Sequence, residues 1–189
     1  MPLTTLNRKL YGNGRKLQTL GGNSRIPRAP SPSLAQNDFD KIDPLVQSIH
    51  SVMGGRPKDL KLAIKCAKLK QSKLPEATTP ELICYIWLTE HGIPFDYQVE
   101  AEGGRQHHGG SVIDFLVRPG RVWAWRIQGT YWHNLTKSQE VDELRRKLLE
   151  GGTVLGYQLD GVVDCWEQRI YQDRDTVFTM GLVGIEIGE

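Results

Sequence analysis

The segment that most constrains the fold is a pair of predicted strands joined by a tight turn. Residues 111–117 are apolar around one acid, Asp114, and Pro119-Gly120 predicts a hairpin turn that leads into a second strand at 121–128. Side chains alternate along a strand, so Asp114 faces away from its apolar neighbours. Burying an acid is costly unless a cation, a metal or hydrogen-bond donors pair with it. Asp114 is therefore predicted to be a site residue.

Strand alternation also assigns the neighbouring side chains to faces. On the first strand it places Ile113, Phe115 and Val117 together on the face opposite to Asp114. The second strand has two expected sets: Ala124, Arg126 and Gln128 on one face, and Trp123, Trp125 and Ile127 on the other. Because both tryptophans share a face with Ile127, we expect them to pack in the core rather than to stack on nucleic-acid bases.

The surrounding pattern predicts an α/β domain. Helices are expected at about 43–53 and 57–70, and a third begins with the capping-box sequence Thr78-Thr79-Pro80-Glu81 and stops at His91-Gly92. A strand at 96–100 precedes the hairpin. A helix at about 137–150, a strand at 153–159, a short helix near 165–171 and a weakly indicated helix at 176–187 follow. This order is typical of a mixed sheet flanked by helices.

The beginning of the chain differs in composition from the rest. Residues 1–37 are rich in Gly, Pro, Ser and Asn and lack acids, while the remainder has 18 basic and 22 acidic residues. Such a segment cannot bury enough apolar surface to fold alone. Its charge suits nucleic-acid phosphates, the acidic surface of a partner protein, or a solvated tail. Its six basic residues are Arg8, Lys9, Arg15, Lys16, Arg25 and Arg28.

Three regions are therefore expected: an extended basic arm at 1–41, a helical linker region at 42–75 and the α/β domain at 76–189. No apolar run is long enough to span a membrane, and the beginning of the chain lacks the apolar centre of a secretory signal peptide. Three cysteines without a Cys-x-x-Cys pair predict buried thiols rather than disulfides or a zinc site. We expect a cytoplasmic protein or a component of a virion.

From Glu81 to Trp166 the chain resembles the PD-(D/E)XK superfamily of restriction-endonuclease-like folds, and most of all its branch related to the very-short-patch-repair endonucleases. The resemblance rests on the helix with Glu81, on Gly110 to Phe115, on Gly129-Thr130-Tyr131-Trp132-His133, on a helix with Asp142 and Arg145, and on Trp166-Glu167. It implies a three-layer restriction-endonuclease-like domain.

The resemblance also implies roles for individual residues. Asp114 matches the metal-binding aspartate, and Glu81 matches the helix acid. Gln128 stands at the lysine position, and His133 matches the histidine of the Trp-His motif. Glu81 is explained equally well by the capping box, and His133 by a structural hydrogen bond at a strand end. The departure is Arg126, which stands where the second metal-binding carboxylate is expected.

A cation in that position opposes metal binding. An arginine about 5 Å from a divalent ion costs roughly 7 kcal/mol at an effective dielectric constant near 20. The sequence therefore predicts no metal cofactor, with Arg126 paired to Asp114 in place of the ion. In the alternative, Asp114 and Glu81 hold Mg²⁺ or Mn²⁺.

These residues favour a catalytically degenerate nuclease-like domain that serves as a structural or assembly component. A phage virion protein of the head-tail connector or head-completion type is the concrete hypothesis, with the arm contacting a neighbouring subunit or nucleic acid. Two alternatives stay open: an active metal-dependent DNA endonuclease or nickase, and a non-catalytic nucleic-acid-binding module.

Overall fold

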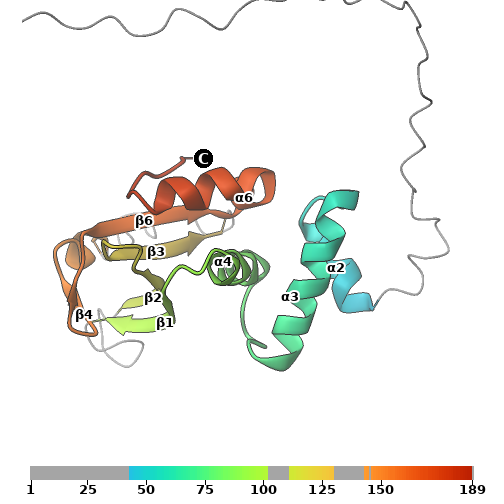
Figure 1. Ribbon diagram of the computed structural model, residues 1–189, viewed down its shortest axis with the longest axis horizontal. Helices are drawn as coiled ribbons and strands as arrows, with labels where there is room; N and C mark the ends of the chain where they lie inside the picture. Colours follow the sequence, from blue (N-terminus) through green and yellow to red (C-terminus); the bar gives the residue numbers. More distant parts are fainter. Residues whose placement is uncertain (1–42, 102–110, 130–142, 145, 189) are drawn as a thin grey trace, which may run out of the picture. The chain divides into compact units, whose positions relative to one another are not determined.

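The computed structural model describes residues 43–101, 111–129, 143–144 and 146–188 (Figure 1). The first part contains α2 (Pro44–Val52), a 3-10 turn (Pro57–Asp59), α3 (Leu60–Ser72), α4 (Thr79–Glu90), β1 (Phe95–Ala101), β2 (Ser111–Val117) and β3 (Trp123–Gln128). Helical residues at 143–144 and 146–149 are followed by β4 (Thr153–Val154), β5 (Tyr157–Gln158), β6 (Gly161–Trp166) and α6 (Glu167–Gly181). The arm at 1–41 lies outside the described residues.

The main sheet is mixed and has the strand order β1-β2-β3-β6. Its first three strands form an antiparallel meander, and β6 lies parallel to β3. A parallel neighbour needs a crossover connection, which the chain between β3 and β6 supplies. Helices pack against this sheet, with α6 lying along β6 and β3 (Figure 1). The expected α/β class with a mixed, helix-flanked sheet is confirmed.

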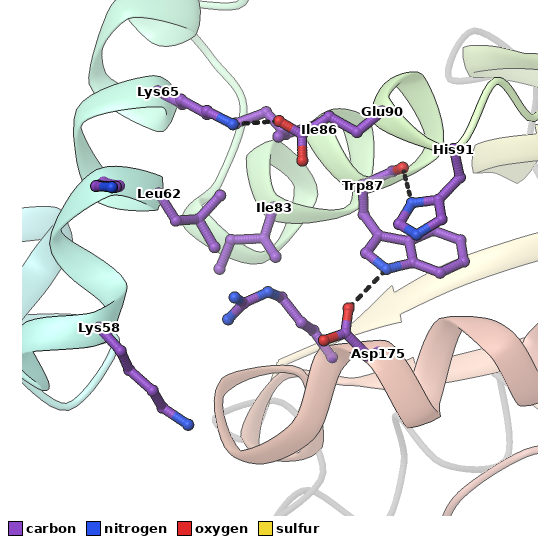
Figure 2. Close-up of a pocket in the computed structure, with 11 residues that line it drawn as sticks. Lys58, Leu62, Lys65, Ile83, Ile86, Trp87, Glu90, His91 and Asp175 are labelled. Carbon is purple, nitrogen blue, oxygen red and sulfur yellow. Dashed lines mark hydrogen bonds and ion pairs between the residues drawn. The ribbon is translucent and has the colours of Figure 1, made fainter.

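Helix α4 begins as the capping box predicts. The carboxylate of Glu81 accepts hydrogen bonds from the backbone N–H of Thr78 at 2.6 Å and from its hydroxyl at 2.7 Å. The helix ends before Gly92, whose φ of +65° is the left-handed conformation that favours glycine. The indole of Trp87 donates to Asp175 at 2.9 Å, which ties α4 to α6 (Figure 2).

Two apolar cores lie on the faces of the sheet. The larger contains residues of α2, α3, α4 and α6, so the helices before residue 75 share a core with the rest of the domain. Trp123 and Trp125 are buried in it, and their indole N–H groups donate to the carbonyls of Leu182 and Gly181. The core position predicted for both tryptophans is confirmed. The smaller core includes Leu149.

The expected grouping of Ile113 with Phe115 and Val117 is wrong. Phe115 and Val117 belong to the larger core, whereas Ile113 packs in the smaller one. On β1 the same change of face occurs across Gln98, whose φ is +50°. A left-handed residue breaks the alternation of an extended strand. In the register of β1 and β2, Tyr97 pairs with Phe115 and Val99 pairs with Ile113. Gln98 therefore lies opposite Asp114, and the side chains change face at the level of this acid.

The strand expected at 153–159 is also wrong. These residues form a small hairpin, β4–β5, whose turn residues Leu155 and Gly156 have φ values of +50° and +80°. The long strand of this region is β6, which starts at Gly161. The helix expected near 165–171 is the beginning of α6, which is kinked at Asp173. The helix indicated at 176–187 is present only as far as Gly181.

All three cysteines are free and buried, as predicted, and burial raises the pKa of each thiol. In the described part of the chain, no helix is long and apolar enough to cross a membrane.

Candidate functional site

The candidate site is centred on Asp164, which the parallel register of β3 and β6 places directly beside Arg126. Ala124, Arg126 and Gln128 share a face of β3 as predicted: Ala124 packs in the smaller core, and the two polar side chains reach Asp164. An acid from one strand and a base from its neighbour thus meet on the face that carries the smaller core.

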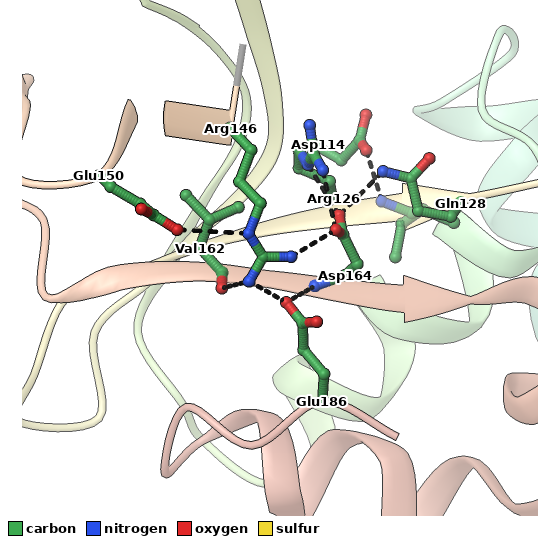
Figure 3. Close-up of polar contacts among 9 residues, drawn as sticks. Asp114, Arg126, Gln128, Arg146, Glu150, Val162, Asp164 and Glu186 are labelled. Carbon is green, nitrogen blue, oxygen red and sulfur yellow. Dashed lines mark hydrogen bonds and ion pairs between the residues drawn. The ribbon is translucent and has the colours of Figure 1, made fainter. Parts of the chain in front are cut away.

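The carboxylate of Asp164 is surrounded by donors (Figure 3). Arg126 binds it in a bidentate manner, with Nε 2.7 Å from Oδ1 and Nη2 2.8 Å from Oδ2. Gln128 donates to Oδ1 at 2.8 Å, and Arg146 donates to Oδ2 at 2.8 Å. A carboxylate has about four lone-pair positions. These four hydrogen bonds therefore satisfy the acceptor capacity of Asp164.

Arg146 extends the cluster beyond the two strands. Its guanidinium contacts Glu186 at 2.6 Å and Glu150 at 3.3 Å, and it donates to the carbonyl of Val162 at 3.2 Å. Glu186 also accepts the backbone N–H of Asp164 at 3.0 Å. The Asp164 cluster, defined as Arg126, Gln128, Arg146, Asp164 and Glu186, therefore joins β3, β6, the helical residues 146–149 and the segment after α6.

The electrostatics of the cluster favour its charged form. Burial by itself raises the pKa of Asp164, but Arg126 and then Gln128 and Arg146 outweigh it, so the pKa lies below its usual value. The hydrogen bond with Glu186 raises the pKa of Arg146 against the effect of burial. Arg126 is 12 % exposed and Asp164 9 % exposed, so solvent screens their attraction only weakly.

The lowered pKa of Asp164 predicts a contribution to acid sensitivity. The pair of Arg126 and Asp164 stabilises the folded state at pH values above the pKa of an unfolded aspartate, about 3.9. This contribution is lost as the pH falls through the lower pKa that Asp164 has in the folded state. The free energy of unfolding should therefore fall more steeply below about pH 4 in the wild type than in Asp164→Asn. Urea unfolding over this pH range measures the difference. Equal slopes in the two proteins would contradict the assignment.

Asp114 lies where β2 and β3 separate. Their pairing ends at Phe115 and Trp125, although both strands continue. At this point Oδ2 of Asp114 accepts the backbone N–H of Ile127 at 2.7 Å, so the side chain replaces a ladder hydrogen bond (Figure 3). The two hydrogen bonds given above for Arg126 are both to Asp164. The pairing of Arg126 with Asp114 stays a prediction.

Glu81 has the capping role, and both Glu81 and Asp114 act on the phenol of Tyr97. Burial raises the pKa of the Tyr97 phenol, and the carboxylates of Glu81 and Asp114 raise it further. Both acids are thus within electrostatic reach of one phenol. Of the other predicted site residues, Gln128 is brought to Asp164, whereas His133 and the six basic residues of the arm lie outside the described residues.

Sequence reasoning missed Asp164, Arg146 and Glu186. A signal for Asp164 was present, because it is a single acid in the apolar run Val162-Val163-Asp164-Cys165, just as Asp114 is in its own strand. That run was not assigned to a strand, so the signal was not used. Glu186 gives the same signal, because it is a single acid between Ile185 and Ile187. Arg146 lies in a polar segment, where the sequence offers no comparable signal.

A divalent metal does not fit the residues around Asp164. Four donors already saturate its carboxylate, and two of those donors belong to the cation Arg126. Within the residues that the structure describes, no group of three or more His, Cys, Asp or Glu side chains is arranged to hold a metal ion. Comparison with known proteins adds no assignment: no protein-family model, curated protein or solved structure matches the chain.

Proposed function

We propose that this chain is a restriction-endonuclease-like domain of the PD-(D/E)XK type that has lost catalysis and serves as a component of an assembly. The order of elements supports the proposal: α4, the antiparallel strands β1 to β3, helical residues at 143–144 and 146–149, and then β6 beside β3. That order agrees with the one on which the resemblance rests. The change of face at Asp114 gives this acid a special position within it.

The observation that carries the loss of catalysis is the bidentate pair of Arg126 and Asp164. Arg126 stands where the resemblance implies a metal-binding carboxylate, and its guanidinium saturates the acid of the neighbouring strand together with Arg146 and Gln128. A metal at this place would have to displace a buried cation from its partner. That displacement would break the bidentate pair and leave the guanidinium beside a divalent ion, which is strongly unfavourable.

The assembly role rests on the basic arm. Residues 1–37 have no acids, and this composition suits a partner's acidic surface or the phosphates of nucleic acid. A phage virion protein of the head-tail connector or head-completion type, located in the cytoplasm before it joins the particle, combines such an arm with a domain that has no need of hydrolysis. The expected partners are other protein subunits, with DNA as a further contact.

Nuclease activity tests this proposal. Incubation of the full chain with labelled duplex, nicked and branched DNA in the presence of Mg²⁺ or Mn²⁺ should leave every substrate intact, in the wild type and in Asp114→Ala alike. An active nuclease run in parallel confirms that the substrates can be cut. Cleavage by the wild type that Asp114→Ala abolishes would instead establish the endonuclease alternative, with Asp114 and Glu81 as metal ligands.

A further inference from the structure

A separate cationic cavity lies among α3, α4 and α6. Its volume is about 210 Å³, and four cations from two parts of the chain line it: Lys58, Lys61, Lys65 and Arg174. Its apolar part includes Leu62, Ile83 and Trp87, and the side chain of Lys58 extends toward α6 (Figure 2). Because α4 and α6 contribute to the larger core, whereas Asp164 shares its face with the smaller one, this cavity is distinct from the Asp164 cluster.

The charges that line the cavity are only partly neutralised. Lys65 pairs with Glu90, and Asp175 accepts the indole N–H of Trp87. Within the described residues, neither Lys58 nor Lys61 has an acidic oxygen in ion-pair range. The lining itself has four cations and two acids, and Lys58 and Arg174 also lie close enough to Asp173 to lower the pKa of that carboxyl.

Arg174 provides a directional donor in this cavity. Its Nη1 is held 3.2 Å from Oδ1 of the fully buried Asp59, and its side chain is 29 % exposed. Among the described residues, its guanidinium makes no further hydrogen bond, although it also acts on the nearby carboxylate of Asp173. A guanidinium that is fixed at one end suits the planar, two-point recognition of a phosphate group.

A row of lysines continues from the cavity along α3. Lys61, Lys65 and Lys68 are spaced by four and three residues, so they lie on one side of the helix, and all three are exposed. At a rise of about 1.5 Å per residue, the row is about 10 Å long. Successive phosphates of one duplex strand advance by about 3.4 Å along the axis. The row is therefore long enough to follow more than one phosphate.

We infer that this surface, the α3 cavity with its lysine row, binds the phosphodiester backbone of a nucleic acid. One phosphate enters the cavity toward Arg174, Lys58 and Lys61, and the next ones lie along Lys65 and Lys68. A solvated lysine face accounts for the row of lysines. It does not explain why these lysines and Arg174, which is more than 100 residues away in sequence, line the same cavity. A mononucleotide would leave the row unused. The inference does not depend on the fate of the Asp164 site.

Two double variants with equal charge loss test the inference in the full chain. Lys58→Ala/Lys61→Ala changes the α3 cavity. Arg121→Ala/Lys147→Ala removes two exposed cations elsewhere, one of them in an exposed pair with Glu143. Affinity for a short fluorescent duplex and for the matching single strand is measured by anisotropy over a range of salt concentrations. Both proteins keep the basic arm, so its contribution cancels in the comparison.

The cavity variant should bind about tenfold more weakly, and the slope of log K against log salt should become shallower by about two, because about one counterion is released for each phosphate contact. The control variant should bind within about twofold of the wild type, since exposed pairs contribute little. Equal weakening in both variants would show an effect of net charge alone and overturn the inference. The inference would also be overturned if the wild type bound no nucleic acid. The same holds if inorganic phosphate or a mononucleotide competed as strongly as the unlabelled strand does.

Discussion

Replacing Asp164 with alanine is expected to lower the free energy of unfolding by about 3–5 kcal/mol, the usual cost of removing one partner from a buried ion pair. The substitution leaves Arg126, which is 12 % exposed, without the carboxylate that binds it in a bidentate manner. Arg146 and Gln128 lose an acceptor at the same time. The loss should therefore exceed that of a typical surface substitution several times over.

Urea unfolding of the variant measures this loss, and Asp96→Ala is its matched control. Asp96 also pairs with an arginine, Arg118, but its side chain is 42 % exposed. Removing such an exposed partner should cost less than about 1 kcal/mol. Similar losses in the two variants would show that the Asp164 cluster is a surface feature without special energetic weight.

Arg126→Glu should have a comparable or larger effect. The variant places two carboxylates side by side on β3 and β6, and like charges about 4 Å apart cost about 4 kcal/mol at an effective dielectric constant near 20. One of the two should therefore take up a proton, which makes the loss of stability smaller at mildly acidic pH than at neutral pH. Urea unfolding at both pH values measures this difference.

The same variant restores the pair of carboxylates that a divalent ion requires. Mg²⁺ or Mn²⁺ should therefore stabilise Arg126→Glu, and a concentration about 100 times the Kd adds about 2.7 kcal/mol. Arg126→Gln is the matched control, because it removes the cation without adding a ligand charge. It should lose stability but gain none from metal. Equal stabilisation of both variants would mean that the ion binds somewhere else.

Much of the fold could be predicted because its signals are local. The capping box at Thr78 and Glu81 fixed the beginning of α4, and alternation placed Trp125 in the core and Arg126 on the opposite face. The turn at Pro119-Gly120 separated β2 from β3. Each of these features depends on residues that are close together in sequence.

Other parts depend on conformations that the residue types disfavour. Leucine rarely adopts a positive φ, so Leu155 gave no sign that it begins a turn, and the hairpin β4–β5 was predicted as one strand. Gln98 is a comparable case: its positive φ changes the face of β1, and nothing in its neighbours indicates this. The change of face that separates Ile113 from Phe115 on β2 lies opposite Gln98 in the register of the two strands.

The contact of Arg126 with Asp164 could not be predicted because it spans a crossover. Asp164 is 38 residues further along the chain, and the register of two parallel strands is set by packing rather than by a turn between them. Hairpin geometry suggested Asp114, which is close in sequence. The predicted site therefore lay on β2 and β3 and lacked the acid that β6 contributes.

Titration of the wild type with Mn²⁺, followed by calorimetry and by the thermal unfolding midpoint, is the most direct test that a guanidinium has replaced a divalent ion. We expect no saturable binding and no shift of the midpoint, both in the wild type and in Asp114→Ala. A saturable Mn²⁺ site in the wild type that disappears in Asp114→Ala would contradict the account.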